Sequence, residues 1–403
     1  MPTSVVDRYV VESHRRAIFP DLQVPGQPGA TLTNNHERRR GIGTFHGPTD
    51  VTFPTLIPFR PKLWTKSAAT GLIVLPGGAF KFLSHGKEST EVCRFFVMRS
   101  GVTCFAVQYR VPFWTEKLPW GVAPLLDAQR AVGVVRHNLS AEFNLNPSRV
   151  GVLGLSAGGF LLPQLFATCG GGGETPRAYA RIDRADDVSC RPDFSVLIYP
   201  FYLACEGNVD MASKLDASTR DFLSMITGWP GKNLDDPLRA NAPTELPGYL
   251  YTGQATMLRL PACAHTLGSR PHWVPAQAGE RQTPAVLNPA AFPPPELLGK
   301  HPPTFIAAES TDPVAMVGGE LYLRALRNGS RTWNFRPDQA LGRYNVRRSD
   351  RAELHVWNTS NAHGRGAACA MTRIHSAPPK PEESSMCEAW PFVVATWLAQ
   401  HAM

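Results

Sequence analysis

The sequence has no long hydrophobic run. A membrane-spanning helix needs about eighteen or more consecutive apolar residues, and no stretch of this chain approaches that length. The first twenty residues, MPTSVVDRYVVESHRRAIFP, also lack the uninterrupted apolar core of a secretory signal. We therefore expect no transmembrane segment and a cytoplasmic protein.

The cysteines do not form a metal-binding or redox pattern. No two of them are spaced as C-x-x-C, which makes metal ligation an unfavourable interpretation. Without a secretory signal, we expect reduced thiols in an intracellular protein. The eight positions are Cys93, Cys104, Cys169, Cys190, Cys205, Cys263, Cys369 and Cys387.

Dense charge is also scarce, although the formal net charge is +8. The basic residues are spread along the chain, and only residues 36–40 (HERRR) form a compact run. No aromatic residues are interleaved with that run and no nucleic-acid motif accompanies it, so a solvated loop is the favoured interpretation. We expect no nucleic-acid partner.

What is present is a large apolar fraction arranged in short strands and helices. At 403 residues and 43% hydrophobic, the chain can bury a sizeable core. Apolar runs predict buried strands, and helical spacing of apolar residues predicts helices between them. This alternation favours an α/β fold, with a mostly parallel, doubly wound sheet covered on both faces. The predicted strands are 71–75, 102–108, 150–155, 194–199, 304–308 and 353–357, and the predicted helices are 124–143, 158–168, 319–327 and 388–400.

Four segments depart from this alternation. Residues 1–50 are predicted to be an irregular N-terminal extension, and residues 51–403 a single domain with insertions at 170–190, 204–300 and 328–351. Structureless loops of this length are unusual within compact domains. The longest insertion, 204–300, is either a lid over an active site or a surface insertion, and the sequence leaves both open.

A serine nucleophile is indicated by residues 154–158, GLSAG. An apolar strand precedes this motif and a helix follows it. Serine at such a turn is exposed to substrate, and the small residues two positions away allow the strand and the helix to approach closely. We interpret Ser156 as a nucleophile. A serine hydroxyl needs a base, and the base needs a carboxylate to orient it.

An oxyanion loop is indicated upstream, where a predicted strand ends in PGGAF. Glycines at this point allow backbone N–H groups to point at a developing oxyanion, together with the N–H of the residue after the nucleophile. The predicted donors are Gly77, Gly78 and Ala157.

The acid and the base follow two later strands. Asp312 comes after strand 304–308, and His363 lies in a glycine-flanked loop after strand 353–357. The chain order Ser156, Asp312, His363 is the nucleophile–acid–base order of α/β-hydrolases.

Other residues compete for these two roles. The alternative bases are His355, which is expected to pack within its strand, and His375, which lies in a proline-rich loop. Glu309 is the nearest alternative acid, but it is too close to its strand to reach far. Asp338 and Asp350 are expected to form surface ion pairs.

Several blocks together resemble a known family. The segments LPGGAFKFLSHGKE, GLSAGG, RPDFSVLIYP, STDPV and ELHVWNTSNAHG are similar to α/β-hydrolases of the acetylxylan- and feruloyl-esterase-like group. The blocks cover somewhat over half the chain, within residues 50–168, 191–203, 302–327 and 352–400. The chain departs from the group at Ala79, where a third glycine is usual.

The resemblance implies a serine esterase that cleaves small acyl esters through an acyl-enzyme, with no metal and no cofactor. It implies Ser156, Asp312 and His363 as the triad, and Ala79 and Phe80 as residues near the substrate. A plant polysaccharide is not the expected substrate, because no secretory signal is found. An amide or formamide hydrolase and a catalytically silent binding protein are the alternatives. The oligomeric state is left open.

Overall fold

The computed structural model describes most of the predicted strands and helices of the chain and parts of the rest. The described residues are 9–11, 16–18, 39–42, 45–48, 51–62, 68–80, 82–111, 122–169, 179, 181–201, 203–205, 285–287, 297–310, 312–329, 332–333, 343–358 and 377–402.

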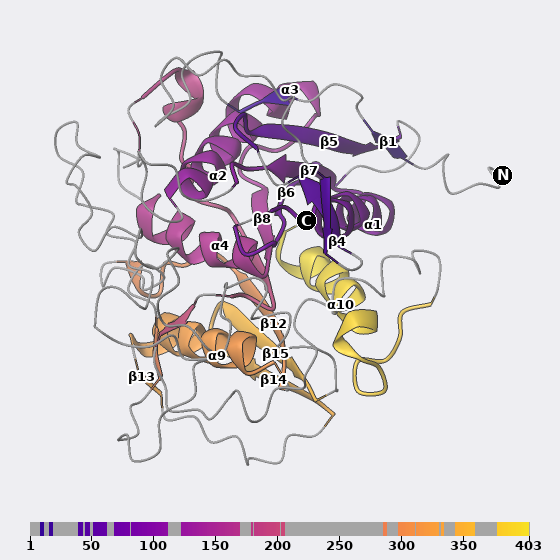
Figure 1. Ribbon diagram of the computed structural model, residues 1–403, viewed down its shortest axis with the longest axis vertical. Helices are drawn as coiled ribbons and strands as arrows, with labels where there is room; N and C mark the ends of the chain where they lie inside the picture. Colours follow the sequence, from indigo (N-terminus) through magenta and orange to yellow (C-terminus); the bar gives the residue numbers. More distant parts are fainter. Residues whose placement is uncertain are drawn as a thin grey trace.

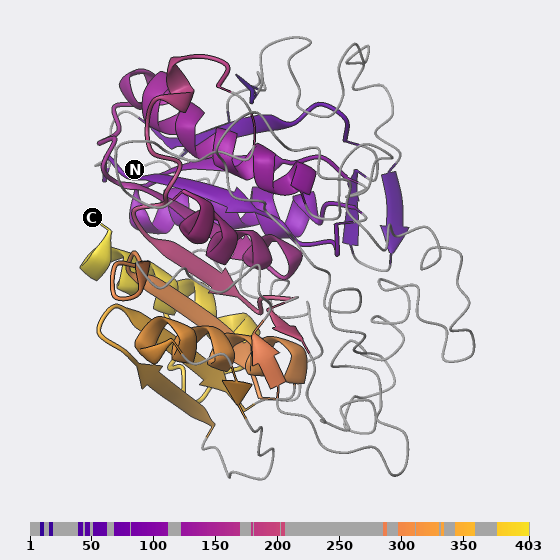
Figure 2. The same cartoon turned by 90° about the vertical axis from the view of Figure 1, so that its left-hand side faces the viewer.

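A ten-stranded sheet forms the centre of the described structure (Figures 1 and 2). Its strand order is β1-β5-β7-β6-β8-β9-β12-β15-β14, with β2 paired to β5. The six strands from β7 to β15 in this order run parallel, whereas β5 and β14 pair antiparallel to their neighbours at the two sides. The bounds are β1 Tyr9–Val11, β2 Arg16–Ala17, β5 Thr55–Pro61, β6 Gly71–Leu75, β7 Thr103–Gln108, β8 Val150–Leu155, β9 Ser195–Ile198, β12 Thr304–Glu309, β14 Tyr344–Arg348 and β15 Ala352–Trp357.

All six predicted strands are confirmed, as β6, β7, β8, β9, β12 and β15. Every residue of β6, β7, β8, β9 and β12 is buried, because helices cover both faces of a parallel sheet. The predicted α/β-hydrolase architecture follows from this order, in which β8 lies at the centre of the sheet.

Helices cover the two faces (Figure 1). Helices α2, α4 and α9 lie on one side of the sheet, and α1 packs against α10 on the other. The predicted helices correspond to α2, α4, α9 and α10, and α1 was not anticipated. The bounds are α1 Glu91–Ser100, α2 Val122–Val134, α3 Ser140–Glu142, α4 Ala157–Thr168, α9 Pro313–Asn328 and α10 Met386–His401, with short helical turns η3 Gly86–Thr90, η4 Val135–Leu139 and η5 Arg184–Asp186.

Parts of the expected irregular segments form strands. In the N-terminal extension, β1 and β2 pair with β5, while β3 (Arg39–Ile42) pairs with β4 (Phe45–Pro48). In segment 328–351, β14 is the antiparallel edge strand beside β15. In segment 204–300, the short strands β10 (Ala204–Cys205) and β11 (Ala285–Leu287) form a small sheet with β13 (Thr332–Trp333). The lid prediction otherwise lies outside the described residues.

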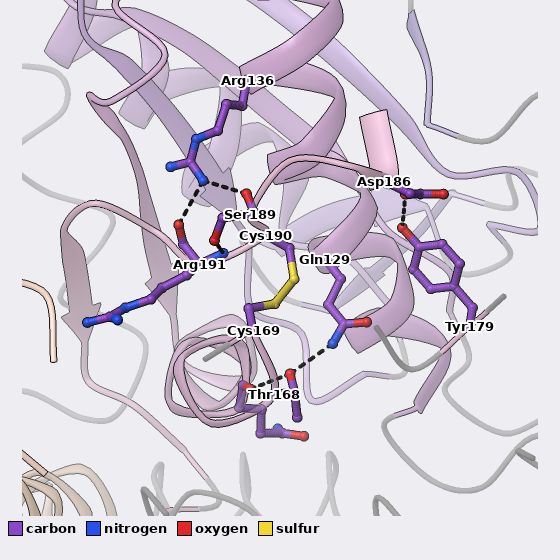
Figure 3. The surroundings of a disulfide bond; sticks show 10 residues. Gln129, Arg136, Thr168, Cys169, Tyr179, Asp186, Ser189, Cys190 and Arg191 are labelled. Carbon is purple, nitrogen blue, oxygen red and sulfur yellow. Dashed lines mark hydrogen bonds between the residues drawn. A yellow bond between two sulfur atoms is a disulfide. The ribbon is translucent and has the colours of Figure 1, made fainter. Parts of the chain in front are cut away.

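Two disulfides overturn the expectation of reduced thiols. Cys93 of α1 is bonded to Cys104 of β7, with Cα atoms 5.3 Å apart. Cys169, directly after α4, is bonded to Cys190 (Figure 3), and their Cα atoms are also 5.3 Å apart. Cys387 is disulfide-bonded as well. These cysteines are distant in sequence and meet only after the chain has folded, so their spacing carried no signal.

Disulfides persist in oxidising compartments and are rare in the cytosol. The expected reduced cysteines were one argument for a cytoplasmic protein, and the disulfides remove that argument. In the described part of the chain, no helix is long and apolar enough to cross a membrane.

The Cys93–Cys104 disulfide is expected to stabilise the fold by cross-linking α1 to the sheet. Both side chains are fully buried, and 11 residues separate them in sequence. A loop of this size reduces the entropy of the unfolded chain by an amount worth about 2–4 kcal/mol. The double variant Cys93→Ala/Cys104→Ala should lose about this much free energy of unfolding, measured by urea denaturation without reductant. An unchanged denaturation midpoint would contradict the cross-link.

Candidate active site

Ser156 occupies a strained turn between β8 and α4. Its backbone angles are φ 50° and ψ −119°, in a region that residues other than glycine rarely adopt. The Ser156 N–H donates to the carbonyl of Ile198 (3.0 Å), and the Ser156 carbonyl accepts from Gly159 and Phe201 (2.9 and 3.0 Å). The side chain is 8% exposed. This is the conformation that places a serine hydroxyl above the carboxyl edge of a parallel sheet.

Close backbone packing requires the two glycines of the predicted motif. A Cβ at Gly154 would lie 2.4 Å from the carbonyl oxygen of Gly158, and a Cβ at Gly158 would lie 2.1 Å from the carbonyl oxygen of Leu75. Real Cβ contacts are not this short, so any side chain there would force the backbones apart. The glycines thus allow α4 to start directly against β8 and β6, as the sequence motif predicts.

The predicted oxyanion loop turns beside Ser156. Gly78, Ala79 and Phe80 have consecutive positive φ values of 128°, 53° and 57°. A Cβ on Gly77 would lie 2.8 Å from the Cβ of Ser156, so the loop backbone passes next to the nucleophile. The loop is held by Tyr109, whose hydroxyl donates to the carbonyl of Pro76 (2.5 Å).

Glu88 is a buried carboxylate beneath this loop that the sequence analysis did not identify. The residue is 3% exposed. Its Oε2 accepts from the Gly77 N–H at 2.6 Å, and its Oε1 accepts from the Tyr199 hydroxyl at 3.1 Å. The Gly77 N–H is therefore bound to the carboxylate. Of the three predicted oxyanion donors, Gly78 and Ala157 remain. Glu88 lies in a helical turn, and its isolated position in the sequence gave no sign of this contact.

Tyr199 joins the same buried cluster. It follows β9 with a positive φ of 36°. Burial is the main cause that raises the pKa of the Tyr199 hydroxyl well above its ordinary value, and the charges of Glu88 and Asp312 raise it further. The hydroxyl therefore stays protonated and acts as the donor to Glu88.

The structure places Phe80 differently from the expectation that it lies near substrate. Phe80 is fully buried, and its ring packs against Tyr109 and Phe160, with ring centroids 6.0 and 6.5 Å apart. It therefore anchors the oxyanion loop in the core. Ala79 is 3% exposed and has a positive φ of 53°, which glycine would adopt without strain.

Asp312 lies at the carboxyl edge of the sheet, between β12 and α9. It is the N-cap of α9, where its Oδ1 accepts from the Ala315 N–H (3.1 Å), and it is 3% exposed. The alternative acid Glu309 is the last residue of β12 and is also buried. Strands β8 and β12 both pair in parallel with β9, which lies between them. Ser156 and Asp312 therefore follow strands that end at the same edge of the sheet.

His363, the predicted base, and the alternative His375 lie outside the described residues, as does Asp338. The other alternative base, His355, packs within β15 as expected. Its Nε2 lies 3.0 Å from Glu353 and its ring stacks on Phe305 at 4.3 Å. Burial lowers the pKa of His355, although Glu353 opposes this shift. The alternative acid Asp350 lies just before β15, at the opposite edge of the sheet from Ser156.

Within the described ranges, no group of three or more His, Cys, Asp or Glu side chains is arranged to hold a metal ion. The site that the described residues build consists of a serine at a strained turn, a glycine loop and a buried carboxylate cluster. Such a site can present an oxygen nucleophile beside backbone N–H donors.

Comparison with known proteins supports the same fold. Residues 72–250 match a family model described as the alpha/beta hydrolase fold. An acetyl ester-xyloside bifunctional hydrolase from Caldicellulosiruptor lactoaceticus has a similar structure, with a TM-score of 0.51 and 20% sequence identity over 96% of each chain. At this identity the similarity establishes the fold alone.

A curated relative confirms the predicted resemblance. An acetylxylan esterase from Xylanibacter ruminicola is 28% identical over 145 residues, which is 36% of this chain. The match spans only 25% of that relative's length.

Glu88 is expected to stabilise the loop through its two hydrogen bonds. Glu88→Gln keeps the size of the side chain but removes the charge that accepts from Gly77 and Tyr199. Hydrogen bonds to a buried charged group contribute about 1.5–3 kcal/mol each, so we expect the free energy of unfolding to fall by about 1–3 kcal/mol. Urea denaturation at neutral pH measures this difference.

Tyr199→Phe provides the matched control, since it deletes one of the two donors and leaves the charge. Its loss of stability should be the smaller of the two. A Glu88→Gln protein as stable as the wild type would show that the carboxylate does not hold the loop.

Proposed function

We propose, from the α/β-hydrolase fold of this chain, that the protein is a serine hydrolase of carboxylic esters with small acyl groups such as acetyl. The observation that carries the proposal is the strained turn of Ser156 between β8 and α4, facing the loop of Gly77 and Gly78. Small acyl groups are favoured by the methyl group that Ala79 carries where a third glycine is usual in the loop, and the named activity of the acetylxylan esterase relative points the same way.

In the proposed reaction, the Ser156 Oγ attacks the ester carbonyl carbon while His363 takes the hydroxyl proton. Asp312 accepts a hydrogen bond from the other ring nitrogen and orients the imidazole. The C–O bond to the leaving alcohol then breaks, and His363 returns the proton to that oxygen. Water repeats the sequence on the acyl-enzyme, which releases the acid and regenerates Ser156.

The strand order supports these roles. Asp312 follows β12 and His363 follows β15, and β12 and β15 are neighbouring parallel strands. The loops after neighbouring parallel strands share one edge of the sheet, so the acid and the base start from adjacent positions. The buried N-cap position of Asp312 fixes its carboxylate before the imidazole reaches it.

We assign the oxyanion to the N–H groups of Gly78 and Ala157. Ala157 is the first residue of α4, where backbone N–H groups have no partner within the helix. Gly77, the third predicted donor, is instead assigned to the support of the loop, because its N–H donates to Glu88. One oxyanion donor is worth about 3–4 kcal/mol of barrier.

The triad is tested with p-nitrophenyl esters of increasing chain length. We expect hydrolysis of acetate to be fastest, and kcat to fall about a millionfold in Ser156→Ala and His363→Ala. Asp312→Asn should lower kcat about ten-thousandfold, because the imidazole loses its orienting acceptor. An N-formyl amide substrate in the same series separates an esterase from a formamide hydrolase.

Three matched variants serve as controls. Ser310→Ala removes a hydroxyl that bonds to Asn358 on the same edge of the sheet, and should leave kcat unchanged. Glu309→Gln and His355→Gln test the alternative acid and base, and should retain most of the activity. Wild-type rates in Ser156→Ala would disprove the nucleophile, and a larger loss in Glu309→Gln than in Asp312→Asn would reassign the acid.

Ala79 gives a second test of the proposed acyl site. Its φ of 53° is strained for alanine, so Ala79→Gly should raise the free energy of unfolding by about 1 kcal/mol. Removal of the methyl group should also increase the rate on butyrate relative to acetate. Ala69→Gly, at a similar φ of 52°, is the control that should gain stability without a change in acyl preference. An unchanged butyrate-to-acetate ratio in Ala79→Gly would exclude Ala79 from the acyl site.

A further inference from the structure

A cavity of about 700 Å³ opens at the opposite edge of the sheet from Ser156. Residues just before four parallel strands line it: Pro147 and Ser148 before β8, Asp193 before β9, Pro303 before β12 and Arg351 before β15. Strand β8 has six residues, each advancing about 3.3 Å, so this edge lies about 20 Å from the nucleophile. The cavity is therefore a separate site, of the size that holds small organic ligands.

Part of the cavity lining, here called the proline wall, is apolar and rigid. It is built largely from proline rings, which have few conformations to lose when a ligand binds. The residues of this wall are Pro147, Val188, Pro192, Pro302 and Pro303. Such a surface favours contact with a flat ring or a short hydrocarbon body over a hydrated inorganic ion.

Arg136 ties together the backbone segments that line the cavity. Its guanidinium donates to the carbonyls of Pro147, Ser189 and Arg191, at 2.8, 2.5 and 3.0 Å. It also donates to the Asp193 carboxylate at 2.6 Å, and the same carboxylate oxygen accepts from the Val150 N–H. Arg136 and Asp193 thus form an ion pair, and Asp193 is the one carboxylate among the described residues that line the cavity.

Arg191 and Arg351 remain as cations at the same cavity. Within the described ranges, neither guanidinium forms an ion pair with a carboxylate. The Arg191 guanidinium lies over the ring of Phe166, 5.0 Å from its centroid. Burial is the main cause that lowers the pKa of Arg191, and the charge of Arg351 lowers it further, whereas the charge of Asp193 opposes this shift. The like charges of these two lining residues therefore disfavour each other.

The Cys169–Cys190 disulfide fixes the loop that carries one of these cations. Cys190 lies between Ser189 and Arg191, whose carbonyls accept from Arg136 (Figure 3). The Arg191 side chain points away from this anchored backbone in Figure 3. The loop is thus held by a disulfide and by two hydrogen bonds from Arg136, and the Arg191 side chain extends from this fixed backbone.

We propose that this cavity binds a small organic dianion, in which a doubly charged group such as a phosphate monoester lies between Arg191 and Arg351. The apolar body of the ligand lies on the proline wall. Two guanidinium groups offer paired N–H donors in the geometry that phosphate and carboxylate oxygens accept. A dianion would also relieve the repulsion between the two arginines.

The test uses the full-length oxidised protein and phenyl phosphate as the probe, with binding measured by isothermal titration calorimetry. We expect saturable 1:1 binding that weakens with added salt, because exposed charges are screened. Arg191→Gln and Arg351→Gln should each weaken binding about tenfold, and the double variant should abolish measurable heat. Inorganic phosphate should bind at least tenfold more weakly than phenyl phosphate, since it makes no contact with the proline wall.

The control Arg348→Gln/Lys380→Gln removes the same charge from two exposed surface ion pairs elsewhere. It should bind phenyl phosphate as the wild type does. Rates of ester hydrolysis and denaturation midpoints of the arginine variants should match the wild type, which excludes unfolding as the cause of lost binding. Equal loss in the control, or undiminished binding in the Arg191/Arg351 double variant, would overturn the proposal. Equal affinities for phenyl and inorganic phosphate would overturn the role of the proline wall.

Discussion

The contact between the start of α4 and the ends of β6 and β8 constrains the whole candidate active site. A side chain at Gly158 would meet the carbonyl of Leu75 at 2.1 Å, and one at Gly154 would meet the carbonyl of Gly158 at 2.4 Å. These distances require glycine and fix the helix against two strands at once. The strained φ of Ser156 is tolerated because both flanking elements are held in this way. The positions of the nucleophile and of the Ala157 N–H are therefore set by backbone packing, before any side-chain contact is counted.

The loop beside the nucleophile needs a different kind of support, because three successive residues hold positive φ values. Phe80 supplies an apolar anchor in the core, and Glu88 supplies a charged one by binding the Gly77 N–H. A buried carboxylate is costly unless donors surround it, and here a backbone amide and a tyrosine hydroxyl do so. The same interaction removes Gly77 from the set of free donors, so structural support and oxyanion binding are divided between adjacent residues.

The central part of the fold could be predicted from the sequence, since buried parallel strands are short apolar runs such as those of β6 and β8. Strand β14 was missed because an edge strand of sequence YNVRR is half exposed and polar. The disulfides were missed because Cys93 and Cys104, like Cys169 and Cys190, meet only through tertiary structure. Ser156 and the glycine loop have a local motif, whereas Glu88 has none: its role depends on a loop 11 residues away. Phe80 was assigned to substrate by its place in the motif, but its backbone conformation turns the ring into the core.

The two edges of the sheet carry different chemistry, and α4 connects them. The carboxyl edge offers backbone N–H groups around Ser156, which suit an oxyanion that exists only during reaction. The opposite edge offers the side-chain cations Arg191 and Arg351, which suit a stable anion. Helix α4 begins at Ala157 and ends beside Cys169, whose disulfide holds the loop of Arg191. A ligand at the cationic edge cannot touch a substrate about 20 Å away. Strand β8, which starts beside the cavity and ends at Ser156, and helix α4, which starts at Ala157 and leads into the Cys169–Cys190 disulfide, are two elements that join the edges.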